Sequence, residues 1–231
     1  MVAGGVPVSS GSSLLTGLTA YYTLSNTADS AGSNTLTNIG GVTFVAGKVG
    51  NAANLVSAST QRLAAADSAS FQMGVGNFTV AAWVKWTDNS TERTICFYGG
   101  YGANGYGLWT HNNELWAVVT TGDPTVIQAT NVGIGYGDGV FHLAVATFNR
   151  ASNVDLWVDN GQTGNYVPGV ISGVAGNMNS SVGFQIGADE SPPTNYIDAV
   201  VDEVGVWNRI LTPTEITALW NGGAGTTYPF P

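Results

Sequence analysis

Apolar and polar positions alternate along much of the chain, which is the pattern of strands that bury one face. The clearest case is 77–86, whose apolar positions share one face: Phe78, Val80, Ala82, Val84 and Trp86. Comparable runs occur at 18–24, 107–109, 114–120, 140–148, 154–158, 182–186 and 196–207. Turn signals separate them, at 123–124, 137–139, 159–161 and 191–193. Many short strands with tight turns predict an all-β sandwich or barrel.

One helix is predicted near the C-terminus. Thr212 can cap its first turn, Pro213 fits the first helical position, and Glu215 completes a capping box. The apolar residues of the next turns share a face: Ile216, Leu219 and Trp220. Gly222 can end the helix.

The chain is expected to form one domain, because no linker divides its 231 residues and β domains of this length are common. We assign 17–223 to this domain and 224–231 to a C-terminal tail. Residues 1–16 lack strand or helix patterning and are expected to form an arm that docks on a partner.

Composition narrows the partners. Only 9% of residues are charged, against about 25% in an average protein, and the net charge is −9. Such a chain is not attracted to phosphate backbones, so no nucleic-acid partner is expected. Neither a signal peptide nor a membrane-spanning segment is predicted, so we expect no secretory export and no membrane partner. The single cysteine, Cys96, lies in an apolar run and is expected to be a buried thiol.

Five segments, in order, resemble those of a known family. The segment 50–55 resembles an early "GxAxxF" strand, 77–85 an "FTISAWVK" strand, and 141–161 a "WHHVAxTYD … LYVDG" hairpin. Two further matches are 184–187 and the closing segment 197–223. The chain therefore resembles laminin-G-like, concanavalin A-like jelly-roll domains, including those of bacteriophage virion proteins. This resemblance implies an all-β fold: a two-sheet antiparallel jelly-roll sandwich with one short C-terminal helix.

The resemblance also implies a function. Such domains bind glycans, mediate adhesion or assist an enzyme, often with calcium, and the ending 220–230 looks like that of phage-encoded members. We expect a non-catalytic virion or extracellular protein, a capsid decoration or tail fibre module. Its partners would be other virion proteins, further copies of itself, or host-surface glycans. The alternative is a free carbohydrate-binding lectin module, or an accessory domain of a polysaccharide-active system.

Two aspartates are the candidate calcium ligands that the resemblance implies. Asp29 matches an early "DxSG" loop and Asp202 matches the "IDEV" strand. Calcium needs six to eight oxygen ligands at about 2.3–2.6 Å, and the ion would be structural. The alternative is that Asp29 forms an Asx turn, while Asp202 and Glu203 accept backbone hydrogen bonds.

The candidate ligand-binding residues come from the glycine-rich segment 97–107 and the strand that follows. They are Tyr98, Tyr101, Tyr106 and Trp109. Tyrosine offers a flat apolar ring with a polar tip, which suits sugars and protein interfaces alike. The alternative is that the tyrosines fold back over the sandwich; Trp109 and Trp116 can also face a groove.

Hydrolytic activity is not predicted. The sequence has no "ExDxE" run and no Gly-x-Ser-x-Gly motif, although Asp198 and Asp202 can share a strand face. His142 lies in a strand pattern and is expected to be a packed structural residue. His111 is expected to lie in a turn.

Overall fold

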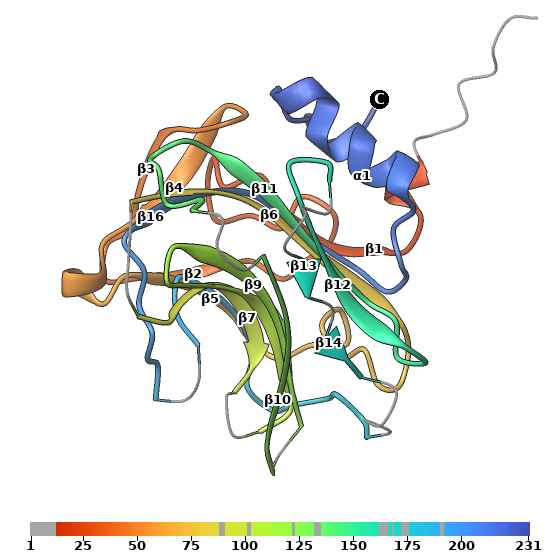
Figure 1. Cartoon of the computed structure of the whole chain (residues 1–231). Coiled ribbons are helices and arrows are strands. Elements are labelled where there is room, and N and C mark those ends of the chain that lie inside the picture. Colours follow the sequence, from red (N-terminus) through yellow and green to blue (C-terminus); the bar gives the residue numbers. More distant parts are fainter. Residues whose placement is uncertain are drawn as a thin grey trace, which may run out of the picture.

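The protein was analysed as a computed structural model (Figure 1). The structure describes residues 13–87, 91–100, 103–121, 123–131, 135–161, 166–167, 169–171, 176–189 and 192–231. Two antiparallel sheets stack face to face across this part of the chain. The predicted two-sheet sandwich with a short C-terminal helix is therefore confirmed.

Sheet A has the order β14-β12-β11-β6-β16-β4-β3, with β1 paired to β16. Its strands are β1 (Leu18–Tyr22), β3 (Thr43–Ala46), β4 (Asn51–Leu55), β6 (Phe78–Trp86), β11 (His142–Phe148), β12 (Asn153–Val158), β14 (Gly169–Val170) and β16 (Ala199–Trp207). Sheet B has the order β13-β10-β9-β8-β7-β15-β5-β2. Its strands are β2 (Thr37–Ile39), β5 (Arg62–Ala65), β7 (Arg93–Gly99), β8 (Gly105–His111), β9 (Glu114–Thr121), β10 (Asp123–Asn131), β13 (Tyr166–Val167) and β15 (Phe184–Ile186).

The main core lies between the two sheets and follows the predicted alternation. Along β6 the apolar residues of one face are nearly inaccessible to solvent: Phe78, Val80, Ala82, Val84 and Trp86. Aromatic rings fill the space, with Phe71 stacked on Phe184 at 5.0 Å and Phe78 on Phe148 at 4.3 Å between centroids. Burial of this apolar surface is the dominant force that holds the sheets together.

A second core covers the outer face of sheet A. The helix α1 (Pro213–Trp220) lies across this face (Figure 1), and its Ile216 and Leu219 are buried. Trp220 stacks on Trp83 of β6 at 5.2 Å. The C-terminal segment 224–231 also contributes to this layer: Tyr228 and Phe230 pack on Tyr21, at 5.4 and 5.1 Å between ring centroids. Most of this face is therefore closed to ligands.

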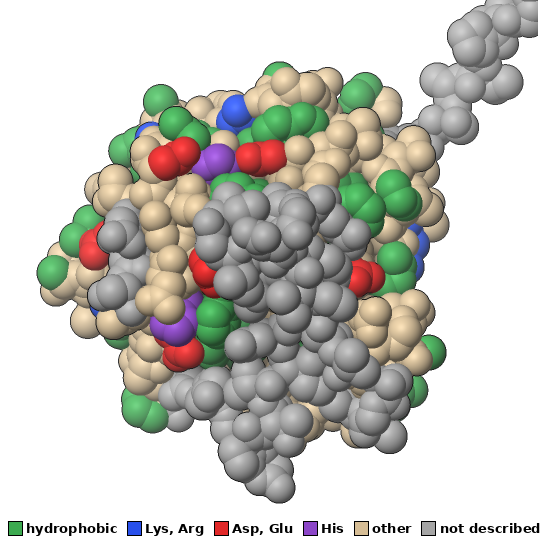
Figure 2. All heavy atoms as spheres, in the orientation of Figure 1, with side chains coloured by type: hydrophobic (Ala, Val, Ile, Leu, Met, Phe, Trp, Pro, Cys, Tyr) green, Lys and Arg blue, Asp and Glu red, His purple; other side chains and the backbone are tan. Residues whose placement is uncertain are grey.

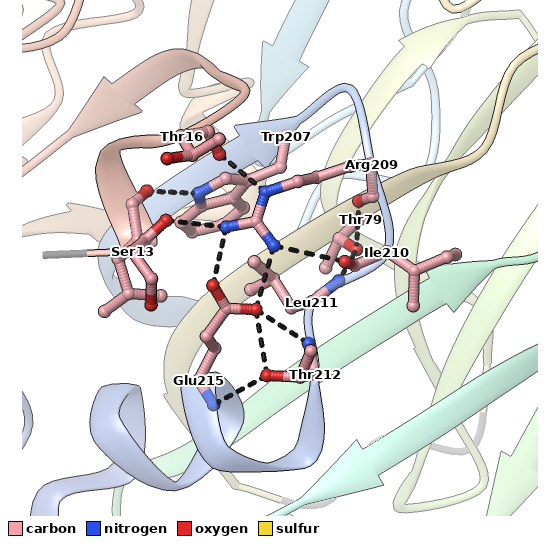
Figure 3. A network of polar contacts seen from close by, with 10 residues as sticks. Ser13, Thr16, Thr79, Trp207, Arg209, Ile210, Leu211, Thr212 and Glu215 are labelled. Carbon is pink, nitrogen blue, oxygen red and sulfur yellow. Dashed lines mark hydrogen bonds and ion pairs between the residues drawn. The ribbon is translucent and has the colours of Figure 1, made fainter.

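The predicted capping box begins α1. The Thr212 hydroxyl accepts a hydrogen bond from the Glu215 amide at 3.3 Å, and the Glu215 carboxylate accepts one from the Thr212 amide at 2.8 Å (Figure 3). These bonds satisfy amide groups that have no partner inside the helix. Short 3-10 turns lie at Ser13–Leu15, Ser57–Ser59 and Asn221–Gly223.

Arg209 joins the start of the described chain to this helix (Figure 3). Its guanidinium donates to Glu215 through both carboxylate oxygens, at 2.7 and 2.8 Å. The remaining N–H groups donate to the carbonyls of Ser13, Thr16 and Ile210 at 2.6–3.2 Å. Of the predicted arm 1–16, residues 13–16 thus belong to the fold, while 1–12 lie outside the described residues.

Candidate functional site

Two of the predicted ligand-binding tyrosines are in the interior. Tyr98 on β7 and Tyr106 on β8 have no accessible surface, and their hydroxyls bond to Asp67 at 2.9 Å and to the Phe71 carbonyl at 2.7 Å. The prediction that they contact a ligand is wrong, because the strands extend further than the glycine-rich sequence indicated and alternation turns both rings inward. Tyr101 lies outside the described residues.

Trp109 lies on the opposite, outer face of sheet B. It is 1% exposed and packs against Phe97 of β7, at 5.5 Å between ring centroids, and Val118 of β9. The Phe97 ring lies against β8 where that strand has glycine: a Cβ at Gly107 would come 2.8 Å from the ring and 2.1 Å from the Cys96 carbonyl. Trp109 therefore supports the surface from below instead of presenting its own ring to a ligand.

Among the described tryptophan and phenylalanine residues of this face, Trp116 reaches solvent. It is half-buried and lies opposite Trp109 in the β8–β9 register. Its indole N–H donates to Glu114 at 3.1 Å, and His111 contacts its ring edge-on at 4.6 Å. We call the set Phe97, Trp109, Trp116 and Val118, with His111 and Glu114 at its end, the aromatic face.

The sequence contained a signal for the aromatic face. In 114–120 the residues Trp116 and Val118 occupy one set of alternating positions, and the core residues Leu115, Ala117 and Val119 occupy the other. This alternation is the signal that places Trp116 on the outer face, where the sequence already allowed Trp109 or Trp116 to face a groove. His111 ends β8 and pairs with Glu114 across the β8–β9 turn, close to its expected place in a turn.

The strands of the aromatic face carry few acidic residues. Strands β7, β8 and β9 together carry one carboxylate, Glu114. Glycoside hydrolysis uses two, about 5.5 Å apart for retention and further apart for inversion. An aromatic ring, a carboxylate and an imidazole can instead make apolar and hydrogen-bonding contacts to a ligand without reacting with it.

His142 is a packed structural residue, as predicted. It is 9% exposed, and its ring nitrogens contact Asp159 at 2.6 Å and Asp138 at 3.2 Å. Burial lowers the pKa of His142, but the hydrogen bonds and charges of the two aspartates outweigh it, so the pKa lies above its usual value. Figure 2 shows histidine at two places on one face of the molecule, each beside acidic side chains.

Asp29 holds a turn together. Its two carboxylate oxygens accept five N–H groups at 2.7–3.1 Å, from Tyr21, Ala31, Gly32 and, twice, Asn34. A carboxylate has about four lone-pair sites, so these donors fill it. The Asx-turn alternative describes this geometry.

Asp202 is also occupied by backbone donors. It is fully buried and accepts the amides of Lys48, Val49 and Glu203 at 2.8–2.9 Å. Burial raises its pKa to about 6. Among the described residues, no group of three or more acidic, histidine or cysteine side chains is arranged to hold a metal. N–H donors around both aspartates do not fit a cation, and calcium binding stays a prediction that these contacts do not favour.

Glu203 follows Asp202 at an irregularity in the β16–β6 pairing. It is 4% exposed, has φ +49°, and accepts a hydrogen bond from the Tyr21 hydroxyl. Burial raises its pKa to about 8; the Tyr21 hydrogen bond opposes the shift and the Asp202 charge adds to it. This acid lies inside the second core and is not open to a ligand.

Comparison with known proteins decides the family. The family described as the concanavalin A-like lectin/glucanases superfamily, in its laminin G form, matches residues 57–217, more than half of the chain. The chain belongs to this superfamily. A search of curated protein sequences with this chain found no significant match. Within its described residues, no helix is long and apolar enough to cross a membrane.

Solved structures share the fold of this lectin/glucanase-type domain at low identity. The binding domain of Paraclostridial Mosquitocidal Protein 1 has a TM-score of 0.72 and 12% identity, over 90% of this chain and 52% of that one. The binding domain of botulinum neurotoxin serotype G has a TM-score of 0.69 and 15% identity, over 89% of this chain and 51% of that one. The ligand-binding domain of botulinum neurotoxin serotype D, solved in complex with N-acetylneuraminic acid, has a TM-score of 0.68 and 13% identity, over 89% of this chain and 51% of that one. The chain thus spans about half the length of these structures.

Proposed function

We propose that this chain is a non-catalytic, lectin-like module that contacts glycans through the aromatic face of sheet B. The observation that carries the proposal is Trp116, which is half-exposed, fixed through its N–H by Glu114, and backed by Trp109. A ring held in this way loses little conformational entropy when a ligand stacks on it.

The neighbours of Trp116 support a polar, ring-shaped ligand. A sugar presents an apolar C–H face, which suits the indole ring, and a rim of hydroxyls, which suits Glu114 and His111. The superfamily contains lectins and glucanases. We favour the lectin role because β7, β8 and β9 carry one carboxylate, where glycoside hydrolysis uses a pair.

Substitution of Trp116 tests this proposal. We expect Trp116→Ala to weaken retention on polysaccharide gels and binding on a glycan array at least about tenfold. Truncation of a tryptophan that anchors an interface costs about 2 kcal/mol or more, and about 1.4 kcal/mol corresponds to a tenfold change. Trp157→Ala is the matched control, because Trp157 is also a half-buried strand tryptophan but lies on sheet A. Equal binding by both variants, with unchanged circular dichroism, would refute the aromatic face as the glycan site.

We further propose that the module acts in a virion or another extracellular particle, as a capsid decoration or tail fibre component. The sequence resemblance and the low charge support this role. The Arg209 network also supports it, because it fixes Ser13 and Thr16, at the end of the proposed arm, beside α1. The proposed partners are other virion proteins or further copies of this chain. A free carbohydrate-binding module is the alternative.

Particle association separates the two roles. We expect the protein to co-sediment with purified phage particles and to be labelled on capsids or tails by immunogold electron microscopy. Removing residues 1–12 should abolish this association and leave glycan binding unchanged. A protein that stays in the soluble fraction of a lysate, and still binds glycans, would support the free module instead.

A further inference from the structure

An open hollow of about 360 Å³ lies on sheet A, away from the aromatic face. Its floor is a row of three neighbouring residues across β4, β16 and β6: Asn54, Val200 and Lys85. Val56, Asp198 and Thr87, which adjoin the ends of these three strands in the sequence, also line it, as does Gly139. The neighbouring row of the sheet, with Trp83, is covered by α1 and the C-terminal segment. The hollow therefore occupies the part of this face that the second core leaves open.

Lys85 places a cation at the hollow, and none of the described carboxylates forms an ion pair with it. The Lys85 ammonium lies 5.0 Å from the centroid of the Phe141 ring. The ion pairs found in the described part of the chain involve His142 and Arg209, so no described carboxylate lies within ion-pair distance of Lys85. In a chain of net charge −9, an unpaired lysine at an open hollow is a local site for an anionic group.

The hollow also offers hydrogen-bond acceptors beside Lys85. Asp198 is exposed, and its two oxygens accept hydrogen bonds from the Ser57 amide at 2.8 Å and hydroxyl at 2.6 Å. These two bonds fix the carboxylate and leave about half of its lone-pair sites for a ligand. The Asn54 amide adds a donor and an acceptor beside the apolar Val200.

We propose that this hollow binds a sugar residue that carries a carboxylate. Lys85 pairs with the sugar carboxylate, Asp198 and Asn54 bond to its hydroxyls, and Val200 lies under the ring. The volume suits one sugar residue and not a long chain. This second site is independent of the aromatic face, and it gives the protein a preference for acidic glycans that Trp116 by itself does not provide.

Chemical-shift mapping tests the site and its ligand class. The probes are D-glucuronic acid and N-acetylneuraminic acid, with D-glucose and N-acetylmannosamine as neutral partners, each added to the ¹⁵N-labelled full chain. We expect at least one of the two acids to shift the amide resonances of 54–57, 85–87 and 198–200. That acid should bind at least about tenfold more tightly than its neutral partner. Shifts confined to other residues, or equal affinity for neutral sugars, would overturn the proposal.

Lysine variants test whether Lys85 is the group that binds the sugar carboxylate. Lys85→Met keeps the aliphatic stem over Phe141 but removes the charge, and we expect it to lose the preference for acids. Lys48→Met is the matched control, because Lys48 also lies over an aromatic ring, 4.6 Å from Trp83, outside the hollow. Unchanged acid binding in Lys85→Met would refute the proposal. Trp116→Ala should leave this binding intact, so failure of the aromatic face and failure of the hollow give different results.

Discussion

Glu203 should make the protein less stable as pH rises, and replacing it with glutamine should remove much of this effect. The carboxyl group is buried, and the Tyr21 hydroxyl donates a hydrogen bond to it. Glutamine has almost the same shape, and its amide oxygen can accept the same hydrogen bond. Glu203→Gln therefore changes the ionisation and little else.

The magnitude follows from the pKa of Glu203 in the folded state. Burial raises this pKa to about 8, from an ordinary value of 4.5 in the unfolded chain. The folded state therefore holds its proton more tightly than the unfolded state between these pH values. Stability is greatest below about pH 4.5 and falls until about pH 8. At about 1.4 kcal/mol for each pKa unit, the loss is about 5 kcal/mol at most.

Asp202 contributes in the same direction. Burial raises its pKa from 3.8 to about 6, so part of the loss occurs at lower pH than that of Glu203. A domain of this kind has a total stability of about 5–15 kcal/mol, so the two acids together weaken the protein appreciably in mild alkali.

Urea unfolding, followed by tryptophan fluorescence at pH 5, 7 and 9, measures the effect. Between pH 5 and pH 9 the free energy of unfolding should fall in both proteins. We expect the fall in Glu203→Gln to be smaller than that in the unaltered protein by at least about 2 kcal/mol. Glu92→Gln is the control, because Glu92 is half-buried, directly precedes β7 and lies outside the second core. Parallel pH profiles for the unaltered protein and Glu203→Gln would refute the reasoning.

Two further predictions concern the parts of the fold around the site. Arg209→Ala should lower the free energy of unfolding by about 3 kcal/mol, because it leaves the buried Glu215 carboxylate without its ion pair. Urea unfolding measures this loss, and a change below about 1 kcal/mol would contradict the prediction. Millimolar calcium or EDTA should shift the thermal midpoint of unfolding by less than about 1 °C, because N–H donors already occupy the carboxylate oxygens of Asp29 and Asp202. A clear rise of the midpoint with calcium in differential scanning fluorimetry would instead support a metal site at these residues.

Local patterns made much of the fold predictable. Alternation along 77–86 identified a strand with one buried face, and the Thr212–Glu215 capping box located the start of the helix. Both signals act between residues that are close in sequence, so the chain carries them without any tertiary contact. The same holds for Trp116, whose position relative to Leu115 follows from alternation alone.

Alternation also has a limit, and the tyrosines show it. A period of two separates the faces of a strand but does not say where a strand ends or which face another layer covers. Tyr98 and Tyr106 were interpreted as loop residues because glycines surround them, yet β7 and β8 run through them and sheet packing buries both rings. Glycine is needed at 107 because neighbouring groups leave no room for a Cβ.

The sequence by itself indicated several of the long strands, the helix and the family of this protein, since each of these signals depends on short-range order of residue types. Only the tertiary structure decided which surfaces remain open. It laid α1 on sheet A, joined Arg209 to residues 13–16, and brought Asn54, Lys85 and Asp198 around one hollow. These residues are far apart along the chain, and strand pairing between distant segments is what places them together.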